Sequence, residues 1–402
     1  MKNTKDIIKE TEQWSARNYY PLNIVLEKGE GVWVYDVDGK KYMDMLSAYS
    51  ALNQGHRHPK IIRALIEQAN RITLTSRAFH NDKMGIFLKK LCSMAGFEKA
   101  LPMNTGSEAV ETALKAARKW GYLKKGVREN QGEIIVCQNN FSGRTISIIS
   151  FSTEDQYRYG FGPYTPGFKA IPFKDAAALE KAITENTIAF LVEPIQGEGG
   201  VIVPPEGYLK EVRDITKRKN VLLIFDEVQT GLGRTGKMFA YEHEDAKPDI
   251  LVLGKALGGG CYPVSAVLSS KEIMDVFTPG DHGSTFGGNP LAAAVGIASL
   301  EVLQEENLPE RAGELGSYFM NALKDLNSPY VGEIRGKGLL IGVEIKKECG
   351  TARPYCEKLA ELGILCKETH QQTIRFAPPL VISKDEIHWA MERIEKVLKE
   401  PV

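Results

Sequence analysis

Short apolar runs that alternate with helical segments make up the middle of the chain. Between about residue 58 and about residue 300 these runs are E-I-I-V-C (133–137), I-A-F-L-V-E-P (188–194), V-L-L-I-F-D-E (221–227), D-I-L-V-L-G (249–254) and V-S-A-V-L (264–268). Helical segments separate most of them, which is typical of βαβ units. The pattern predicts an α/β fold with a mostly parallel sheet.

The N-terminal part has a different pattern. Helical character extends to about residue 16 and is followed by the Pro-containing loop N-Y-Y-P-L. Residues 31–45 are rich in β-branched and aromatic residues on both sides of Asp38-Gly39, a pair that favours a tight turn. This segment is therefore predicted to form a β-hairpin.

The C-terminal part predicts a separate α+β domain. A helical pattern at 310–323 gives way to strands within 336–345, another helix, a strand at 373–379 and a closing amphipathic helix. We therefore expect an N-terminal segment that packs near the small domain (1–55), a large domain (56–300) and a small C-terminal domain (301–402).

Composition and charge exclude several classes of protein. The 402 residues are 43% hydrophobic and 25% charged, which is the balance of an ordinary globular enzyme. The 51 basic and 51 acidic residues cancel, so no overall field favours nucleic acid or an anionic membrane. No apolar run approaches the roughly 18 residues that span a bilayer, and the first residues lack the apolar centre of a signal peptide.

Cysteine usage narrows the compartment and the chemistry. The six cysteines are scattered and form no C-x-x-C pair, so neither a metal site nor a disulfide framework is expected. A cytoplasmic protein in a reducing compartment fits this pattern.

Lys255 and Asp226 are the residues with the strongest chemical signal. Lysine is usually a solvated surface charge, but Lys255 ends the apolar run I-L-V-L-G and is followed by glycines, so its pKa should be easily lowered. An uncharged amine can condense with an aldehyde. Asp226 ends another apolar run, where a carboxylate either caps the next element or holds a protonated pyridine nitrogen. Together the two residues indicate pyridoxal phosphate (PLP) chemistry.

A phosphate cradle is predicted at Thr105-Gly106-Ser107, which precedes a helix with one apolar face. Glycine lets the backbone approach a ligand closely, and a helix N-terminus offers free N–H groups and a positive dipole end. Plain N-capping by Ser107 with Glu108 and Glu111 explains the same residues when they are taken alone. In combination with Lys255 and Asp226, phosphate binding is favoured over plain N-capping.

Three further residues are candidates for contacts with a ring held by Asp226. Val228 and Gln229 follow Asp226, and a neutral amide such as Gln229 can bond a phenolic oxygen without adding charge. Phe141 is a core aromatic or a stacking residue, and its polar, Gly-containing loop favours stacking.

The chain resembles the subgroup III aminotransferases of PLP fold type I from about Trp14 to about Val397. The motifs that carry the resemblance are S-A-Y-S-A-L-N-Q-G-H-R-H-P, L-T-S-R-A-F, M-N-T-G-S-E-A-V-E-T-A, E-P-I-Q-G-E-G-G-V, L-G-K-A-L-G-G-G, H-G-S-T-F-G-G-N-P and I-R-F-A-P-P-L, in this order. The resemblance implies a large domain with helices on both faces of a mostly parallel sheet, plus a smaller α+β domain.

The resemblance also implies roles around the cofactor ring. Lys255 would bind PLP covalently and later move the proton between the substrate carbon and the cofactor. Asp226 would pair with the pyridinium nitrogen, and Gln229 would bond the ring oxygen. Val228 would pack on one ring face and Phe141 on the other.

Phosphate binding is implied for Gly106 and Ser107. Thr285 of G-S-T-F would reach the phosphate of the neighbouring subunit's cofactor. This arrangement implies an obligate homodimer or an assembly of dimers.

Substrate carboxylates need positive charge, and the candidates are Arg144 and Arg375, whose planar guanidinium can grip a carboxylate bidentately. Arg375 lies in the apolar stretch I-R-F-A-P-P, where an unpaired charge would be costly. In the resembled family Glu198 is its partner, and it would mask Arg375 until a dicarboxylate arrives. Tyr19 and Tyr49 match positions that contact the donor.

The implied reaction moves the δ-amino group of L-ornithine to 2-oxoglutarate, and N-acetylornithine and 4-aminobutyrate are the alternative donors. Tyrosine hydroxyls in N-Y-Y-P-L and S-A-Y-S favour the free amino acid. An aminomutase would need no 2-oxoglutarate, and a non-catalytic PLP-binding regulator would lack the lysine or the aspartate, which are both present. Ser142 stands where some members carry tryptophan, and it should widen the substrate site.

Overall fold

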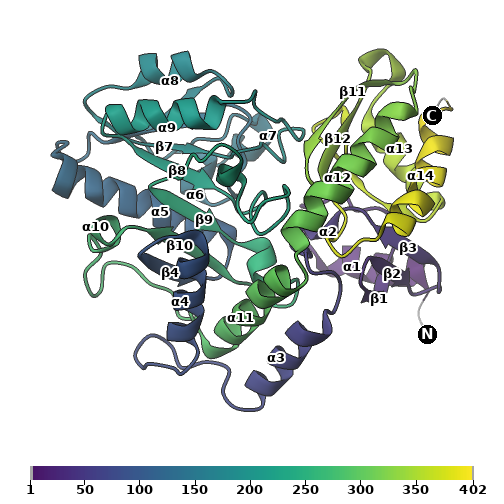
Figure 1. Ribbon diagram of the computed structural model, residues 1–402, viewed down its shortest axis with the longest axis horizontal. Coiled ribbons are helices and arrows are strands. Elements are labelled where there is room, and N and C mark those ends of the chain that lie inside the picture. The colour runs from purple at the N-terminus through teal and green to yellow at the C-terminus, as the bar shows by residue number, and fades with distance from the viewer. Residues whose placement is uncertain (1–2, 401–402) are drawn as a thin grey trace.

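A seven-stranded sheet forms the centre of the larger part of the molecule (Figure 1). The computed structural model describes residues 3–400. The strand order is β4-β10-β9-β8-β7-β5-β6, with β5 to β9 parallel and β10 antiparallel to both of its neighbours. The strands are β4 (Lys99–Met103), β5 (Glu133–Cys137), β6 (Phe168–Ile171), β7 (Thr187–Val192), β8 (Leu222–Asp226), β9 (Ile250–Leu253) and β10 (Ser265–Ser269). The mostly parallel sheet is thereby confirmed.

Two strands of this sheet, β4 and β6, lie outside the predicted apolar runs. Both are edge strands, and each has a polar or proline residue where the central strands have aliphatic ones: Lys99 and Pro102 in β4, Lys169 in β6. Edge strands are covered on fewer sides, so they lack the continuous apolar signal of the central strands.

Helices cover both faces of the sheet, because alternate strand residues point to opposite sides. In β8, Leu222 and Ile224 pack into one core with α5, whereas Leu223 and Phe225 pack into another with α9. The helices of this part are α3 (Pro59–Ala69), α4 (Met84–Ala95), α5 (Gly106–Trp120), η1 (Gly121–Lys125), α6 (Ile146–Ile149), α7 (Asp155–Arg158), α8 (Ala176–Ala182), α9 (Tyr208–Arg218), η2 (Ala240–His243), η3 (Lys255–Gly258), α10 (Lys271–Met274) and α11 (Pro290–Glu305).

A second sheet of four antiparallel strands forms the smaller part, in the order β11-β12-β15-β14. Its elements are α12 (Leu308–Asp325), β11 (Val331–Lys337), β12 (Leu340–Ile345), η4 (Lys347–Cys349), α13 (Ala352–Glu361), β14 (Lys367–Thr369), β15 (Thr373–Phe376) and α14 (Lys384–Leu398). A capping box between Ser383 and Glu386 begins α14.

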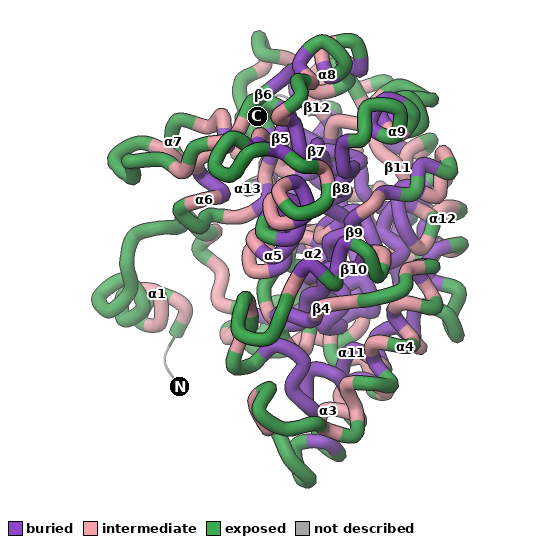
Figure 2. The backbone as a smooth tube through the Cα atoms, turned by 90° about the vertical axis from the view of Figure 1, so that its left-hand side faces the viewer, coloured by how far each residue is buried: buried purple, intermediate pink, exposed green. Residues whose placement is uncertain are grey.

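The N-terminal segment joins the smaller part through a third sheet. Its elements are α1 (Thr4–Trp14), β1 (Leu26–Glu30), β2 (Trp33–Asp36), β3 (Lys41–Asp44) and α2 (Ser47–Ser50), and β3 pairs in parallel with β13 (Ile364–Leu365). The Trp33 indole donates to Glu386 at 2.8 Å, and its ring contacts that of Trp389 at 4.9 Å. Figure 2 shows α1 set apart from the rest, and none of its residues is buried.

The domain limits remain a proposal. Residue 300 lies within α11, so we propose the second boundary at residues 306–307, between α11 and α12. Residues 1–2 and 401–402, at the ends of the terminal domains, lie outside the described residues. Within residues 3–400, no helix combines the length and apolarity needed to cross a membrane.

Candidate active site

A cavity of about 170 Å³ lies where the parallel strands end. Parallel strands present their carboxyl ends at one edge of a sheet, and ligand sites in such sheets form there. The cavity is lined by Gly106, Ser107, Phe141, Ser142, Gly143, Glu193, Asp226, Val228, Gln229, Thr230 and Lys255. All seven residues predicted to contact the ring and phosphate of one subunit's cofactor are therefore brought together.

Lys255 begins η3, one residue after the end of β9, and lines this cavity. Burial lowers the pKa of its amine, while the negative charge of Glu198 opposes that shift. Its backbone is left-handed, with φ of 45°, which is uncommon for a residue with a side chain. The chain thus holds Lys255 in a strained position and favours its uncharged form.

Asp226 ends β8 and is 5% exposed. Burial raises the pKa of its carboxyl group, and hydrogen bonds from the Ser142 hydroxyl and the Val228 N–H oppose the rise. The Val228 N–H lies 3.1 Å from Asp226 Oδ1. Ser142 therefore forms a hydrogen bond with Asp226. That Ser142 also widens the substrate site stays a prediction.

The N-terminus of α5 holds both the predicted cradle and a helix cap. Thr105 and Glu108 form the capping box, in which the Thr105 N–H donates to Glu108 at 2.7 Å, so Thr105 and not Ser107 is the cap. Gly106 and Ser107 lie between the two capping residues and line the cavity. A Cβ atom on Gly143 would lie 2.1 Å from Ser107 Oγ, so only glycine fits beside this turn.

Arg375 and Glu198 form an ion pair beside the cavity, as predicted from the resemblance. Arg375 Nη1 lies 2.5 Å from Glu198 Oε1, and Arg375 is 1% exposed. Gln229 bridges the pair, since its amide donates to Glu198 at 3.1 Å and accepts from Arg375 at 3.3 Å. Burial alone would raise the pKa of Glu198, but the charge and hydrogen bond of Arg375, the charge of Lys255 and the hydrogen bond from Gln229 together lower that pKa to about 2. Glu198 therefore stays ionised at neutral pH.

Arg144 lies among aromatic rings. Its guanidinium carbon is 4.3 Å from the ring centre of Tyr157, 5.9 Å from that of Phe141 and 6.0 Å from that of Tyr19. Tyr19 is 69% exposed. Tyr157, in the four-residue helix α7, has no sequence signal that distinguishes it from a surface tyrosine.

Tyr49 contacts Arg375 from a left-handed turn. Its ring centre lies 4.9 Å from the Arg375 guanidinium carbon. The four residues Ser47–Ser50 have φ of 52°, 46°, 62° and 70°, so α2 is left-handed. Such a conformation costs roughly 1–2 kcal/mol for each residue with a side chain.

Glu193 is a site residue that the sequence reading missed. It follows β7 directly, Asp226 is the last residue of β8, and the register Val192↔Phe225 makes the two residues neighbours. Glu193 accepts the Phe141 N–H at 2.9 Å. Burial, and then the charge of Asp226, raise its pKa to about 8. Its place after a buried strand was a usable signal.

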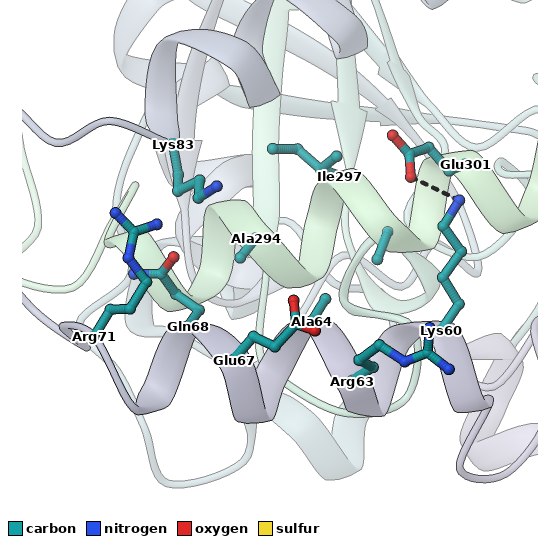
Figure 3. A pocket seen from close by; sticks show the side chains of 11 residues that line it. Lys60, Arg63, Ala64, Glu67, Gln68, Arg71, Lys83, Ala294, Ile297 and Glu301 are labelled. Atoms are coloured by element: carbon teal, nitrogen blue, oxygen red, sulfur yellow. Dashed lines mark ion pairs between the residues drawn. The ribbon is translucent and has the colours of Figure 1, made fainter.

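Thr285 is exposed and does not line the cavity that contains Lys255. A second cavity of about 420 Å³ shares Lys255 and Gly106 with the first, and Thr285 does not line it either. A third, of about 350 Å³, lies between α3 and α11 and shares no lining residue with either (Figure 3). In this third cavity Lys60 forms an ion pair with Glu301 at 2.8 Å, which neutralises part of the positive charge of the cavity lining.

The cavity at the sheet edge fits PLP. It offers a carboxylate for the ring nitrogen, Phe141 and Val228 for the ring faces, a neutral amide in Gln229, and the N-terminus of the 15-residue helix α5 for the phosphate.

Comparisons with known proteins agree with this geometry. The family described as aminotransferase class-III matches residues 14–398. The ornithine aminotransferase of Brevibacillus brevis is 61% identical over 398 residues and covers 99% of each chain. A Toxoplasma gondii ornithine aminotransferase structure with partial occupancy of PLP at its active site has a TM-score of 0.97 and 47% identity, covering 98% of this chain and 94% of that one. An acetylornithine aminotransferase structure from Elizabethkingia anophelis has a TM-score of 0.90 and 51% identity, with 99% of both chains covered. The chain belongs to the class-III aminotransferases.

Proposed function

We propose that this protein is an ornithine δ-aminotransferase. It moves the δ-amino group of L-ornithine to 2-oxoglutarate and gives glutamate and glutamate 5-semialdehyde, which cyclises to pyrroline-5-carboxylate. These metabolites link the reaction to arginine and proline metabolism. The observation that carries the proposal is the Glu198–Arg375 ion pair, together with an Arg144 that forms no such ion pair with a carboxylate among residues 3–400.

PLP, when bound, carries the amino group and draws electrons from the reacting carbon. Lys255 would attach the cofactor through Nζ, and once the substrate's amine has replaced it there, the freed Nζ would take the proton from the substrate's reacting carbon; burial lowers the pKa of this amine. Asp226 holds the proton on the ring nitrogen. Gly106 and Ser107 bind the phosphate through the N-terminus of α5.

Two arginines separate the two half-reactions. Ornithine has no carboxylate on its δ-carbon, so Arg375 must be covered while Arg144, Tyr19 and Tyr49 hold the distant amino-acid end. 2-Oxoglutarate has a carboxylate beside its reacting carbon, and that carboxylate displaces Glu198 from Arg375. A permanently free Arg375 would let glutamate compete as the donor.

Removing Glu198 should favour the half-reaction with glutamate over that with ornithine. In Glu198→Ala the half-reaction with glutamate should speed up by about tenfold, whereas that with ornithine should be slowed or unchanged. Arg375→Ala should slow the 2-oxoglutarate half-reaction by about 10²-fold, the equivalent of about 2–3 kcal/mol for a charge-assisted contact. Stopped-flow measurement of each half-reaction gives both values.

The control is Glu198→Gln, which keeps the volume of the side chain and removes the charge that holds Arg375. It should shift the two half-reactions in the same direction as Glu198→Ala. Equal effects of Glu198→Ala on glutamate and ornithine would contradict the proposed gate.

N-Acetylornithine is the second candidate donor, because an acetylornithine aminotransferase structure is 51% identical over 99% of the chain. Acetylation removes the charge from the α-amino group, so the contacts near Tyr19 and Arg144 decide between the donors.

We also propose a homodimer in which Thr285 binds the phosphate of the partner's cofactor. The exposed Thr285 and the second cavity, which borders Gly106 and Lys255, support this arrangement.

The protein should sediment as a dimer at low concentration and retain its activity. Thr285→Ala should lower PLP affinity by about tenfold, as expected for one lost hydrogen bond to a charged group. Equilibrium dialysis with PLP measures the affinity, and Thr278→Ala, in the same connection between α10 and α11, is the control. A stable, fully active monomer would contradict the shared site.

A further inference from the structure

The left-handed turn Ser47–Ser50 lies where the two parts of the molecule meet (Figure 1). None of its four residues is glycine, and Ala48 and Tyr49 have ψ of 49° and 42°, within the left-handed helical region. Side chains disfavour this conformation, so it persists only where the surrounding structure fixes it.

Asp44 fixes the start of the turn. Its Oδ1 accepts hydrogen bonds from the N–H groups of Leu46 and Ser47, both at 2.8 Å, and its Oδ2 lies 2.8 Å from His56 Nε2. The Ser47 hydroxyl donates to the Ala377 carbonyl at 2.7 Å. The turn is thus tied to the segment that follows β15, the strand that carries Arg375.

Tyr49 is the residue that this turn directs toward the site. Its ring lies 4.9 Å from the Arg375 guanidinium carbon, on the same side chain that Glu198 and Gln229 contact. A change of the turn to right-handed backbone would send the Tyr49 side chain in another direction. Arg375 would then lose one of its covers although every residue that touches it is still present.

We propose that Asp44 is a positioning residue for donor selection. By fixing the left-handed turn it holds Tyr49 against Arg375, and so it hinders a dicarboxylate donor from reaching Arg375 in the first half-reaction. This inference rests on the proposed function, because it concerns the choice between ornithine and glutamate as donors.

Asp36 provides a matched control on the same hairpin. Its Oδ1 accepts from the N–H groups of Asp38 at 3.0 Å and Lys40 at 2.8 Å, and its Oδ2 accepts the Tyr42 hydroxyl at 2.7 Å. Asp36 is 7% exposed and Asp44 is 8% exposed. Alanine at either position therefore removes the same kind of buried anchor, but only Asp44 holds the turn that carries Tyr49.

The test compares kcat/KM for the glutamate and ornithine half-reactions, measured by stopped flow with PLP-loaded enzyme. Asp44→Ala should raise the ratio of glutamate to ornithine by about tenfold, since misplacing a contact group by about 1 Å can change rates by up to 10²-fold. Asp44→Asn keeps the acceptor oxygen and should keep the ratio within about twofold of the wild type. Asp36→Ala should lose thermal stability and keep the ratio.

An unchanged ratio in folded Asp44→Ala, or an equal change in Asp36→Ala, overturns the inference. Where Asp44→Ala does not fold, Ser47→Ala decides, because it removes only the bond to Ala377 and should shift the ratio in the same direction. A wild-type enzyme that leaves ornithine unchanged overturns the proposed function instead. In that case the role of Asp44 is tested with the glutamate half-reaction alone, and the KM for glutamate should be lower in Asp44→Ala than in the wild type.

Discussion

Replacing Lys255 with alanine should abolish transamination and remove the visible absorbance of the lysine-bound cofactor. Turnover should fall by at least about 10⁴-fold, because the variant loses both the covalent attachment and the group that moves the proton. PLP should still bind through Asp226 and the N-terminus of α5. Borohydride reduction of the wild type followed by peptide mapping identifies the labelled lysine directly.

Lys125 is the control for this experiment. Burial lowers its pKa as well, but it lies in η1 and donates to the Thr187 carbonyl at 2.6 Å and the Asn220 carbonyl at 2.8 Å. Lys125→Met should leave turnover per folded molecule unchanged. Label on a lysine other than Lys255 would contradict the assignment.

Asp226→Asn should lower turnover on the order of 10³-fold with little change in fold, because it removes the negative charge that keeps the ring nitrogen protonated. The amide has nearly the same shape and can still accept from the Val228 N–H. Steady-state kinetics with thermal unfolding of the same samples separates loss of chemistry from loss of stability.

Glu227 supplies a neighbouring carboxyl group for comparison. It is buried as deeply, and burial raises its pKa to about 8. It accepts the N–H groups of Ala240 at 2.6 Å and Tyr241 at 3.0 Å, so its role is structural. Glu227→Gln should cost stability and spare turnover per folded molecule. Near-normal activity in folded Asp226→Asn would show that the aspartate only caps its loop.

The central strands could be predicted from the sequence because burial on both faces selects continuous apolar runs. Lys255 and Asp226 could be located because a charged residue at the end of such a run is unusual, and the structure places both in one cavity. The same logic would have found Glu193 after β7. The edge strands β4 and β6 were not predicted, because edge positions accept lysine and proline and therefore lack a continuous apolar run.

The turn Ser47–Ser50 could not be predicted from its residues. Serine, alanine and tyrosine have no preference for left-handed backbone, so the conformation comes from Asp44, Ala377 and the packing between distant segments. Tyr157 could not be predicted as a site residue for a related reason: its contact with Arg144 depends on the path of a loop and not on a local sequence pattern.

An amino-donor panel with 2-oxoglutarate tests the central claim most directly. PLP-loaded enzyme is supplied separately with L-ornithine, N-acetylornithine and 4-aminobutyrate, and both glutamate and pyrroline-5-carboxylate are measured. We expect the highest kcat/KM with L-ornithine and equal amounts of the two products. A higher kcat/KM with N-acetylornithine or 4-aminobutyrate would contradict the assignment of ornithine as the donor.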